Sequence, residues 1–269
     1  MDRSVVLVTG ASRGLGQATA VLLAGHGYQV FGTARNPSAG SAGGVQMVPL
    51  DVTSQESVTS CVSHVLDRAG RIDVLVNNAG AALIGAVEET PVEDAITLFD
   101  TNLFGTARMV NAVLPGMRQR RTGLIINLGS IAPAIPTPFH AYLSASKAAV
   151  NTFTDALRLE VRHLGIAVTT VEPGAMATHP GEQFTKLRVA AAIGDYSQRE
   201  ARAIAVYQHN QQAGAGLQPT AQAILRIIRT PAPARYYLVG REKWYARLGR
   251  ILPPSATETL AARHFQLAK

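Results

Sequence analysis

Glycines spaced to bind phosphate follow the first apolar run of the chain. Residues 4–9 predict a short strand, and Gly-Ala-Ser-Arg-Gly-Leu-Gly comes next, before apolar residues recur at helical spacing through Ala24. Glycine permits a sharp turn and a close approach to a pyrophosphate, whose charge the N-terminus of the following helix stabilises. The order strand, glycine-rich turn, helix therefore predicts a dinucleotide site. Its expected contacts are Gly10, Ser12, Arg13, Gly14, Leu15 and Gly16.

The second expected strand, residues 28–34, ends at Arg35. An acidic residue there would accept hydrogen bonds from ribose hydroxyls, whereas arginine suits a 2′-phosphate through charge-assisted, bidentate bonds. Arg13 can assist from the glycine-rich turn. The two arginines favour NADP(H) over NAD(H), and the alternative is that both lie on the surface without a ligand.

Strands and helices alternate along the rest of the chain. Further strands are expected at 45–50, 72–76, 123–129, 166–171 and 236–239, and further helices at 53–69, 91–118, 139–164 and 219–229. This alternation predicts an α/β fold with about seven parallel strands and helices on both faces, a doubly wound, Rossmann-type architecture. A length of 269 residues and a hydrophobic content of 47% suit a single domain over 1–269.

Composition limits the remaining classes of protein. Cys61 is the only cysteine, which excludes an internal disulfide and a thiolate metal cluster. The first apolar run is too short for a signal peptide, and no run of about 18 apolar residues predicts a membrane-spanning helix. We therefore expect a cytoplasmic protein that needs no metal and binds no nucleic acid.

The net charge of +7 is concentrated in the last part of the chain. Residues 226–269 hold nine basic and two acidic residues, an excess equal to the whole net charge. Trp244, Tyr245 and Leu248 interleave with these charges in the tail at about 241–269. Such a tail could lie on an anionic membrane surface, or it could pack on the core through its apolar side as an ordinary amphipathic helix.

Three further motifs resemble the short-chain dehydrogenase/reductase family: Asn77-Asn78-Ala79-Gly80 after the fourth strand, Ser130 after the fifth, and Pro173-Gly174 after the sixth. The resemblance covers about residues 4–240. It implies that Asp51 and Val52 meet the adenine and that Asn102 holds a water near Lys147, in a helix that is locally irregular at this residue. The remaining cofactor contacts that it implies are Asn78, Ala79, Gly80, Lys147, Pro173, Gly174, Met176 and Thr178.

The resemblance departs from the family at one position. Family members carry a Ser, then a Tyr about thirteen residues later, then a Lys four residues after the Tyr, and these groups transfer the substrate's proton. Here Leu143 is thirteen residues after Ser130 and four before Lys147, whereas Tyr142 is five before it. Helical positions i and i+5 diverge by roughly 140°, so Tyr142 would face Lys147 only if a π-bulge intervened. We interpret Leu143 as a substitution at the position of the Tyr, so that the proton would come from Tyr142 or water. The candidate catalytic residues are Asn102, Ser130, Tyr142 and Lys147.

The resemblance implies an NADP(H)-dependent oxidoreductase that acts on a carbonyl or secondary alcohol, with proton transfer altered by Leu143. Two alternatives stay open: a scaffold repurposed as an isomerase or cyclase, and a non-catalytic NADPH-binding protein. Ser130, Leu143 and Met176 are expected to meet the small-molecule substrate, and residues 179–218 to form its lid. Apolar residues in and near the lid suggest an apolar or aromatic carbonyl: Met176, Phe184, Leu187, Val189, Ile193 and Tyr196. A homodimer or homotetramer is also implied.

Overall fold

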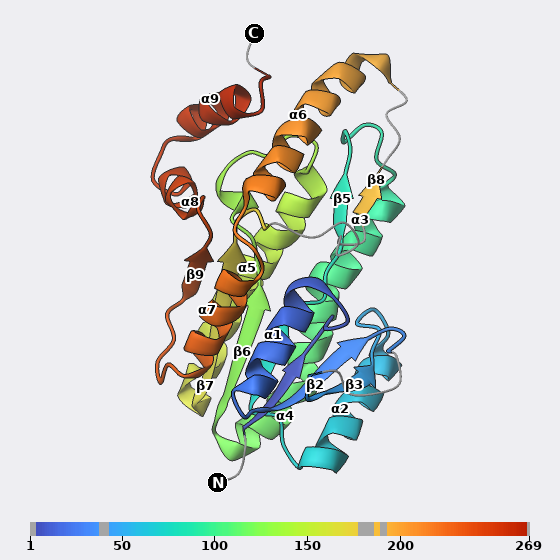
Figure 1. Ribbon diagram of the computed structural model, residues 1–269, viewed down its shortest axis with the longest axis vertical. Coiled ribbons are helices and arrows are strands. Elements are labelled where there is room, and N and C mark those ends of the chain that lie inside the picture. Colours follow the sequence, from blue (N-terminus) through green and yellow to red (C-terminus); the bar gives the residue numbers. More distant parts are fainter. Residues whose placement is uncertain (1–3, 38–42, 177–185, 189–192, 268–269) are drawn as a thin grey trace.

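The computed structural model describes residues 4–37, 43–176, 186–188 and 193–267 (Figure 1). A large sheet of parallel strands consists of β1 (Val5–Val8), β2 (Gln29–Ala34), β3 (Val45–Pro49), β4 (Val74–Asn77), β6 (Gly123–Leu128), β7 (Ile166–Pro173) and β9 (Tyr236–Val239). Their order is β3-β2-β1-β4-β6-β7-β9. The chain thus builds outward from β1 in one direction and from β4 in the other, and the predicted doubly wound sheet is confirmed.

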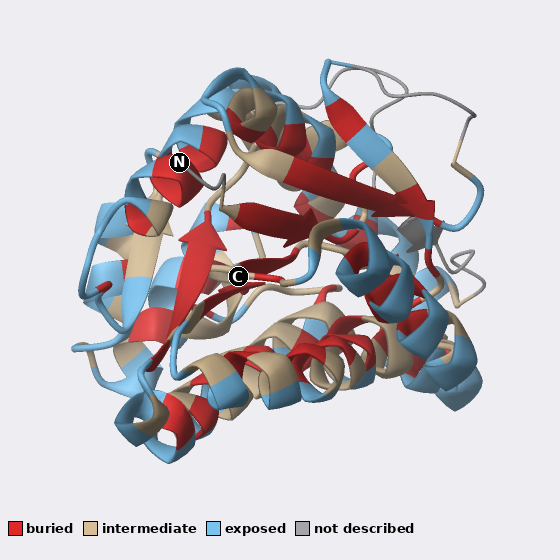
Figure 2. Ribbon diagram, turned by 90° about the horizontal axis from the view of Figure 1, so that it is seen from below, coloured by how far each residue is buried: buried red, intermediate tan, exposed pale blue. Residues whose placement is uncertain are grey.

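Helices cover both faces of the sheet. On one face α1 (Gly14–Gly25) packs beside α7 (Gln218–Ile228), and their apolar sides share one core with the strands. On the other face lie α2 (Gln55–Ala69), α4 (Gly105–Arg120) and α5 (Ala141–Val161), which share a second core. Figure 2 shows the buried strands between helices whose outer sides are exposed. Strands buried on both faces explain why the strand sequences are nearly continuous apolar runs.

The helix boundaries follow local signals. The N-terminus of α2 is capped by Ser54, whose hydroxyl accepts a hydrogen bond of 3.2 Å from the backbone of Ser57. The long helix expected at 91–118 is instead α3 (Val92–Phe99), a π-helical turn η1 (Asp100–Phe104) and α4. Asn102 lies in η1, so its helix is irregular at this point, as the family resemblance implied.

A short parallel pair outside the main sheet was not predicted. It joins β5 (Ala82–Ile84) to β8 (Lys186–Arg188). Within the segment expected as a lid, the structure also describes a long helix, α6 (Gly194–Ala213). Phe184 and Val189, which the lid prediction included, lie outside the described residues.

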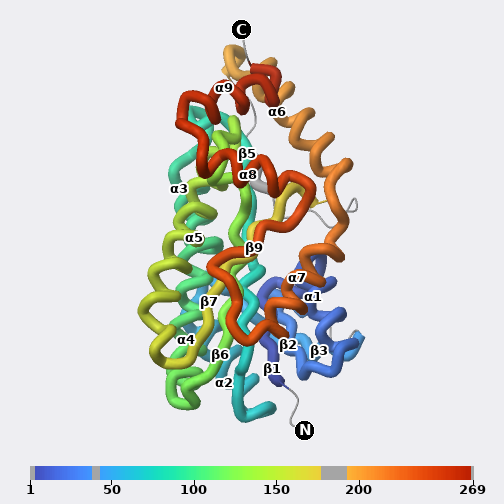
Figure 3. The backbone as a smooth tube through the Cα atoms, turned by 90° about the vertical axis from the view of Figure 1, so that its left-hand side faces the viewer, coloured from blue at the N-terminus to red at the C-terminus, as the bar shows by residue number. Residues whose placement is uncertain are grey.

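The basic tail folds into two helices, α8 (Lys243–Gly249) and α9 (Pro254–His264). Figure 3 shows α8 following the end of β9 and α9 beside α6. Arg250 forms an ion pair with buried Glu172 of β7, and Ala246 of α8 is fully buried. The tail therefore packs on the body, as one of its two interpretations expected. Among the described residues, no helix has the length and apolar character needed to cross a membrane.

Candidate active site

The glycine-rich turn between β1 and α1 has the backbone that its sequence predicted. Gly10 and Gly14 have φ values of 66° and 58°, in the left-handed region that glycine tolerates. A Cβ on Gly16 would overlap the carbonyl oxygen of Gly10, so only glycine lets α1 approach the turn this closely. Among the residues that the structure describes, no side chain caps the N-terminus of α1. Its first N–H groups are therefore available to an anion.

A hydrogen-bonded clamp between Thr9 and Asn78 holds this turn in place. The Thr9 hydroxyl accepts from the backbone N–H groups of Asn78 and Ala79, at 3.0 and 2.9 Å. The Asn78 amide donates to the carbonyl oxygens of Thr9 and Gly10, at 2.9 and 3.0 Å. Part of the predicted cofactor motif thus shapes the glycine-rich turn from the end of the next strand.

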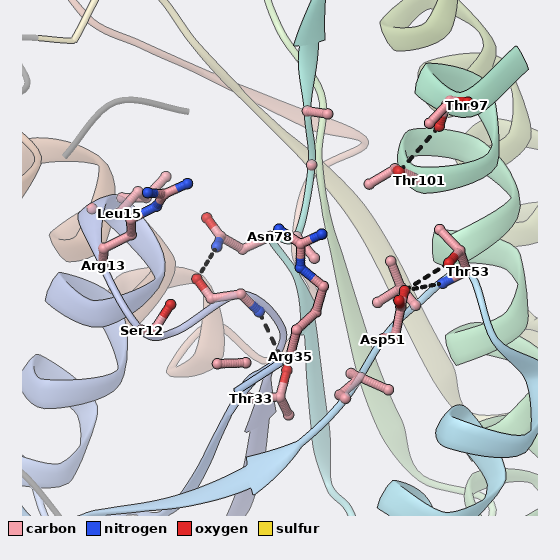
Figure 4. Close-up of a pocket in the computed structure, with 18 of the residues that line it drawn as sticks. Ser12, Arg13, Leu15, Thr33, Arg35, Asp51, Thr53, Asn78, Thr97 and Thr101 are labelled. Carbon is pink, nitrogen blue, oxygen red and sulfur yellow. Dashed lines mark hydrogen bonds between the residues drawn. The ribbon is translucent and has the colours of Figure 1, made fainter. Parts of the chain in front are cut away.

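A cavity of about 450 Å³ lies at the carboxyl ends of β1, β2 and β4 (Figure 4). Arg13 and Arg35 line it, and they start from different elements, the glycine-rich turn and the end of β2. The other predicted residues in its wall are Gly10, Ser12, Gly14, Leu15, Asp51, Val52, Asn78, Ala79 and Gly80. The structure therefore brings together the residues expected around an adenosine and its phosphates, which derive from four separate parts of the sequence.

The cavity fits the phosphate-rich half of a dinucleotide. It combines an uncapped helix N-terminus with two guanidinium groups, and both features favour an anion. The only described carboxylate in its wall, Asp51, is held by Thr53, whose backbone and hydroxyl donate to Asp51 Oδ1 at 2.9 and 2.7 Å. These hydrogen bonds lower the pKa of Asp51. No group of metal-ligating side chains occurs among the described residues.

Lys147 and Asn102 meet beside Gly80, where the cavity ends. A Cβ on Gly80 would lie 3.2 Å from Asn102 Oδ1 and 3.7 Å from Lys147 Nζ. Lys147 Nζ donates to the carbonyl oxygen of Leu128 at 2.8 Å, and burial lowers its pKa to about 8. An amine held in this way is a hydrogen-bond donor that can also lose a proton near neutral pH.

The Asn102 side chain is fully engaged in protein contacts. Its Oδ1 accepts from the backbone of Ala81 at 2.8 Å, and its Nδ2 donates to the carbonyl oxygen of Ala81 and to Ser146 Oγ, at 3.1 and 3.0 Å. Asn102 therefore joins η1 to the loop after β4 and to α5. Asn77 is structural in the same sense: it is buried and donates to Asn127 Oδ1 at 2.9 Å.

Ser130 and the Pro173-Gly174 segment lie side by side at the ends of β6 and β7. Ser130 Oγ accepts from the backbone of Ala132 at 3.1 Å, and the N–H of the intervening Ile131 donates to Pro173 O at 3.4 Å. Gly174 N–H donates to Val239 O at 2.8 Å, which fixes the segment to β9. Thr178, expected to bind the cofactor with this segment, lies outside the described residues.

Met176 lies between the strand ends and the lid region. It forms an isolated parallel bridge with Ala215 and packs at the edge of the core shared by α1 and α7. The thioether is 3.9 Å from Thr220 Oγ1. Met176 therefore connects the end of β7 to the segment after α6.

The helix α5 is a regular α-helix from Ala141 onward. Ser144 N–H donates to His140 O at 2.8 Å, the i to i−4 spacing of an α-helix, and the described π-helical turn is η1, outside α5. Leu143 is therefore the residue one turn before Lys147. Both Tyr142 and Leu143 are half-buried against the apolar cluster of Leu83 and Leu98.

The helix α6 packs over the start of α5. The rings of His140 and Tyr207 lie 4.4 Å apart between centroids, and burial raises the pKa of Tyr207. At its other end α6 is tied to the loop after β5: Tyr196 Oη donates to Glu88 Oε2 and Ile193 N–H to Glu89 Oε1, both at 2.6 Å. Tyr196 and Ile193, two of the apolar residues in the segment expected as a lid, thus attach α6 to the loop after β5.

Sequence reasoning missed several residues of the cavity. Thr33 accepts from the backbone of Gly10 at 3.3 Å, and Thr97 and Thr101 line the far wall, with Thr101 donating to Thr97 O at 3.1 Å. The spacing of four between Thr97 and Thr101 could have placed them on one helical face. Leu217 also lines the cavity, and it lies too far along the chain for any local pattern to reveal it.

Comparisons with known proteins agree on one family. The family model described as short chain dehydrogenase matches residues 4–187. The 3-ketodihydrosphingosine reductase of Bacteroides thetaiotaomicron is 36% identical over 233 residues, covering 87% of this chain and 86% of that protein. A solved short-chain dehydrogenase from Streptomyces avermitilis has a TM-score of 0.84 at 32% identity and covers 93% of this chain and 92% of its own. A serine dehydrogenase complexed with NADP⁺ has a TM-score of 0.74 at 27% identity, with 88% of this chain and 94% of its own covered.

Proposed function

Because the chain belongs to the short-chain dehydrogenase family, we propose that it is an NADP(H)-dependent oxidoreductase that interconverts a carbonyl and a secondary alcohol, with proton transfer altered by Leu143. The observation that carries the proposal is the regular α5 helix. It puts Lys147 beside Gly80 and Asn102, and it puts a side chain without a proton donor one turn earlier.

Binding of the cofactor follows from the charges of the cavity. Arg35 and Arg13 would hold the 2′-phosphate of the adenosine half, and the N-terminus of α1 would stabilise the pyrophosphate. Lys147 would bond the ribose next to the nicotinamide. That the solved serine dehydrogenase contains NADP⁺ supports this choice of cofactor.

The chemistry divides between cofactor and protein. The bound nicotinamide would give or accept a hydride. Ser130 would orient the substrate oxygen with its hydroxyl. Leu143 cannot supply the proton that this oxygen needs, and losing a positioned acid or base costs ~10²- to 10⁴-fold in rate. The proton would then come from water or from another group near the site, so we expect slow turnover.

An apolar ketone is the substrate class that the surroundings favour. The relative from Bacteroides is named for reduction of a keto compound, 3-ketodihydrosphingosine. Leu143, Leu83 and Leu98 form an apolar cluster around the start of α5, and α6 covers this region as part of the proposed lid. Apolar walls with a few polar groups are typical of small-molecule sites.

Association with a second copy is the expected assembly. Large apolar side chains are exposed on α3, η1 and α5: Val92, Ile96, Phe104 and Leu159 are between 53% and 67% exposed. Large apolar side chains left exposed on neighbouring helices often mark a protein interface. We propose that this face forms the contact of a homodimer or homotetramer.

The function is tested by following NADPH consumption with a series of aliphatic and aromatic ketones. We expect slow, ketone-dependent oxidation by the present sequence, and a further loss in Ser130→Ala with NADPH affinity retained. If the protein binds NADPH but none of the ketones causes NADPH to be oxidised, the proposed reaction is contradicted. Failure to bind NADPH at all would contradict the proposed cofactor.

A further inference from the structure

An apolar stripe is exposed on the tail, away from the proposed site. Trp244, Leu248 and Ile251 are 58%, 39% and 81% exposed. Their spacings of four and three residues put them on one side of α8 and the turn that continues it, in which Leu252 N–H still bonds Leu248 O. The buried side of α8 is occupied by Ala246, so the stripe does not serve the core.

Basic residues flank this stripe. Lys243 and Arg247 are exposed on α8 at a spacing of four, next to Trp244 and Leu248, and Arg241 and Arg263 are exposed nearby in the chain. The acidic residue adjacent to Lys243 in sequence, Glu242, turns inward: its Oε2 is buried, and a Cβ on Gly174 would overlap it. The exposed surface of α8 is therefore apolar and positively charged at once.

The rest of the tail holds this surface rigidly. Arg250, on the inner side, pairs with Glu172 and lies 4.2 Å from the ring centre of Tyr236. The helix α9 is joined to α6 by a contact of 3.0 Å between Asn210 Nδ2 and His264 Nε2. Figure 1 shows α9 beside α6, and α8 between β9 and α9, at the end of the molecule toward which the strands point. The surface thus faces outward at the same end of the sheet as the proposed site.

We propose that Trp244, Leu248 and Ile251, with Lys243 and Arg247, form a docking surface for an anionic lipid bilayer. Aromatic and aliphatic side chains would enter the headgroup region, while the flanking cations would bind lipid phosphates. The charge distribution of the chain selects this occupant, because residues 226–269 carry its whole excess of positive charge. Docking does not depend on the proposed reaction, and it is measured without substrate or cofactor.

The chain contains a single tryptophan, Trp244, which is a native probe inside the proposed surface. The full-length protein is mixed with vesicles of phosphatidylcholine alone or with phosphatidylglycerol added. We expect sedimentation only with the anionic vesicles, reversal by salt, a blue shift of Trp244 emission and its quenching by brominated lipid. Binding with unchanged, unquenched emission would overturn the proposal, because the protein would then dock through another surface. Absence of binding at low salt would overturn it as well.

Variants with matched controls locate the surface. Ile251→Glu removes an apolar contact at a position 81% exposed, and Val87→Glu makes the same change at a position 55% exposed elsewhere. The double variant Lys243→Glu, Arg247→Glu reverses two charges on α8. Its control, the double variant Arg118→Glu, Arg162→Glu, reverses two charges far from α8. We expect the α8 variants to lose more than about tenfold in vesicle affinity and the controls to bind as the parent does. Equal binding by all variants would overturn the proposal. A change of oligomeric state in Ile251→Glu without a change in vesicle binding would also do so, because it would assign the stripe to a second copy.

Discussion

Removing Arg250 should destabilise the fold in proportion to how deeply its partner is buried. The Glu172 side chain is 3% exposed and Arg250 31%, and Glu172 also accepts a longer bond of 3.4 Å from Asn151 Nδ2. In Arg250→Ala the carboxylate stays buried without its cation, which typically costs about 3–5 kcal/mol. Because Arg250 is partly exposed, we expect about 3 kcal/mol, or a fall in Tm of roughly 6–12 °C at pH 8.

The loss of stability in Arg250→Ala should grow as the pH rises. Burial raises the pKa of Glu172, and the Arg250 guanidinium opposes this rise. A carboxyl with a raised pKa stabilises the fold at low pH, and this contribution is lost as pH rises through the folded pKa. Removing Arg250 raises that pKa further. The destabilisation should therefore shrink toward acidic pH, as Glu172 takes up a proton, and be larger at pH 8.

A matched variant separates the effect of burying the carboxylate from the effect of the ion pair itself. Arg235 and Asp155 form the other Arg–carboxylate pair at this edge, with side chains 65% and 33% exposed. Arg235→Ala should cost no more than about 1 kcal/mol. Thermal denaturation of both variants between pH 5 and pH 8 makes the comparison. Equal losses in the two variants, or a loss in Arg250→Ala that does not grow with pH, would refute the reasoning.

Three further expectations concern single residues. Arg35→Asp should reverse the cofactor preference, from NADPH at least ~10-fold tighter than NADH to the opposite, in calorimetric titrations; equal affinities for the two in the parent would contradict it. Ser54→Ala should cost about 1 kcal/mol in urea denaturation by removing the cap of α2, whereas Ser60→Ala, exposed within α2, should cost nothing measurable. Lys147→Met should be more stable than the parent below pH 8, because burial lowers the pKa of Lys147 to about 8 and the charged amine destabilises the parent there. The variant should lose up to about 3 kcal/mol of this advantage by pH 10.5, since the parent gains stability as the amine deprotonates. A difference in Tm that does not change with pH would contradict the burial of a charged amine.

Much of the fold follows from local patterns. The sequence predicts the apolar strands, including the one at 236–239, and the sharp turn at Gly10 and Gly14, because each of these features depends on residues close in sequence. The candidate cavity was also predictable, since parallel strands bring their carboxyl ends to one edge. Arg35 and Asp51 meet there for that reason alone.

Contacts between distant segments could not be predicted. The β5–β8 pair joins two strands of three residues a hundred positions apart, and neither has a pattern of its own. The clamp of Thr9 on Asn78, and the attachment of Arg250 to Glu172, likewise depend on tertiary packing. The π-helical turn at Asp100–Phe104 has no signal in propensity, and only the family resemblance implied irregularity there.

Leu143→Tyr tests the central claim most directly. A phenol at this position would stand one turn before Lys147 on the regular helix α5, where we propose that the proton donor is lacking. We expect NADPH-dependent ketone reduction to rise by ~10²-fold or more, the usual worth of a positioned acid. Tyr142→Phe should change little, because five residues separate Tyr142 from Lys147 and turn it to another face. Brisk turnover in the present sequence that disappears in Tyr142→Phe would contradict the account.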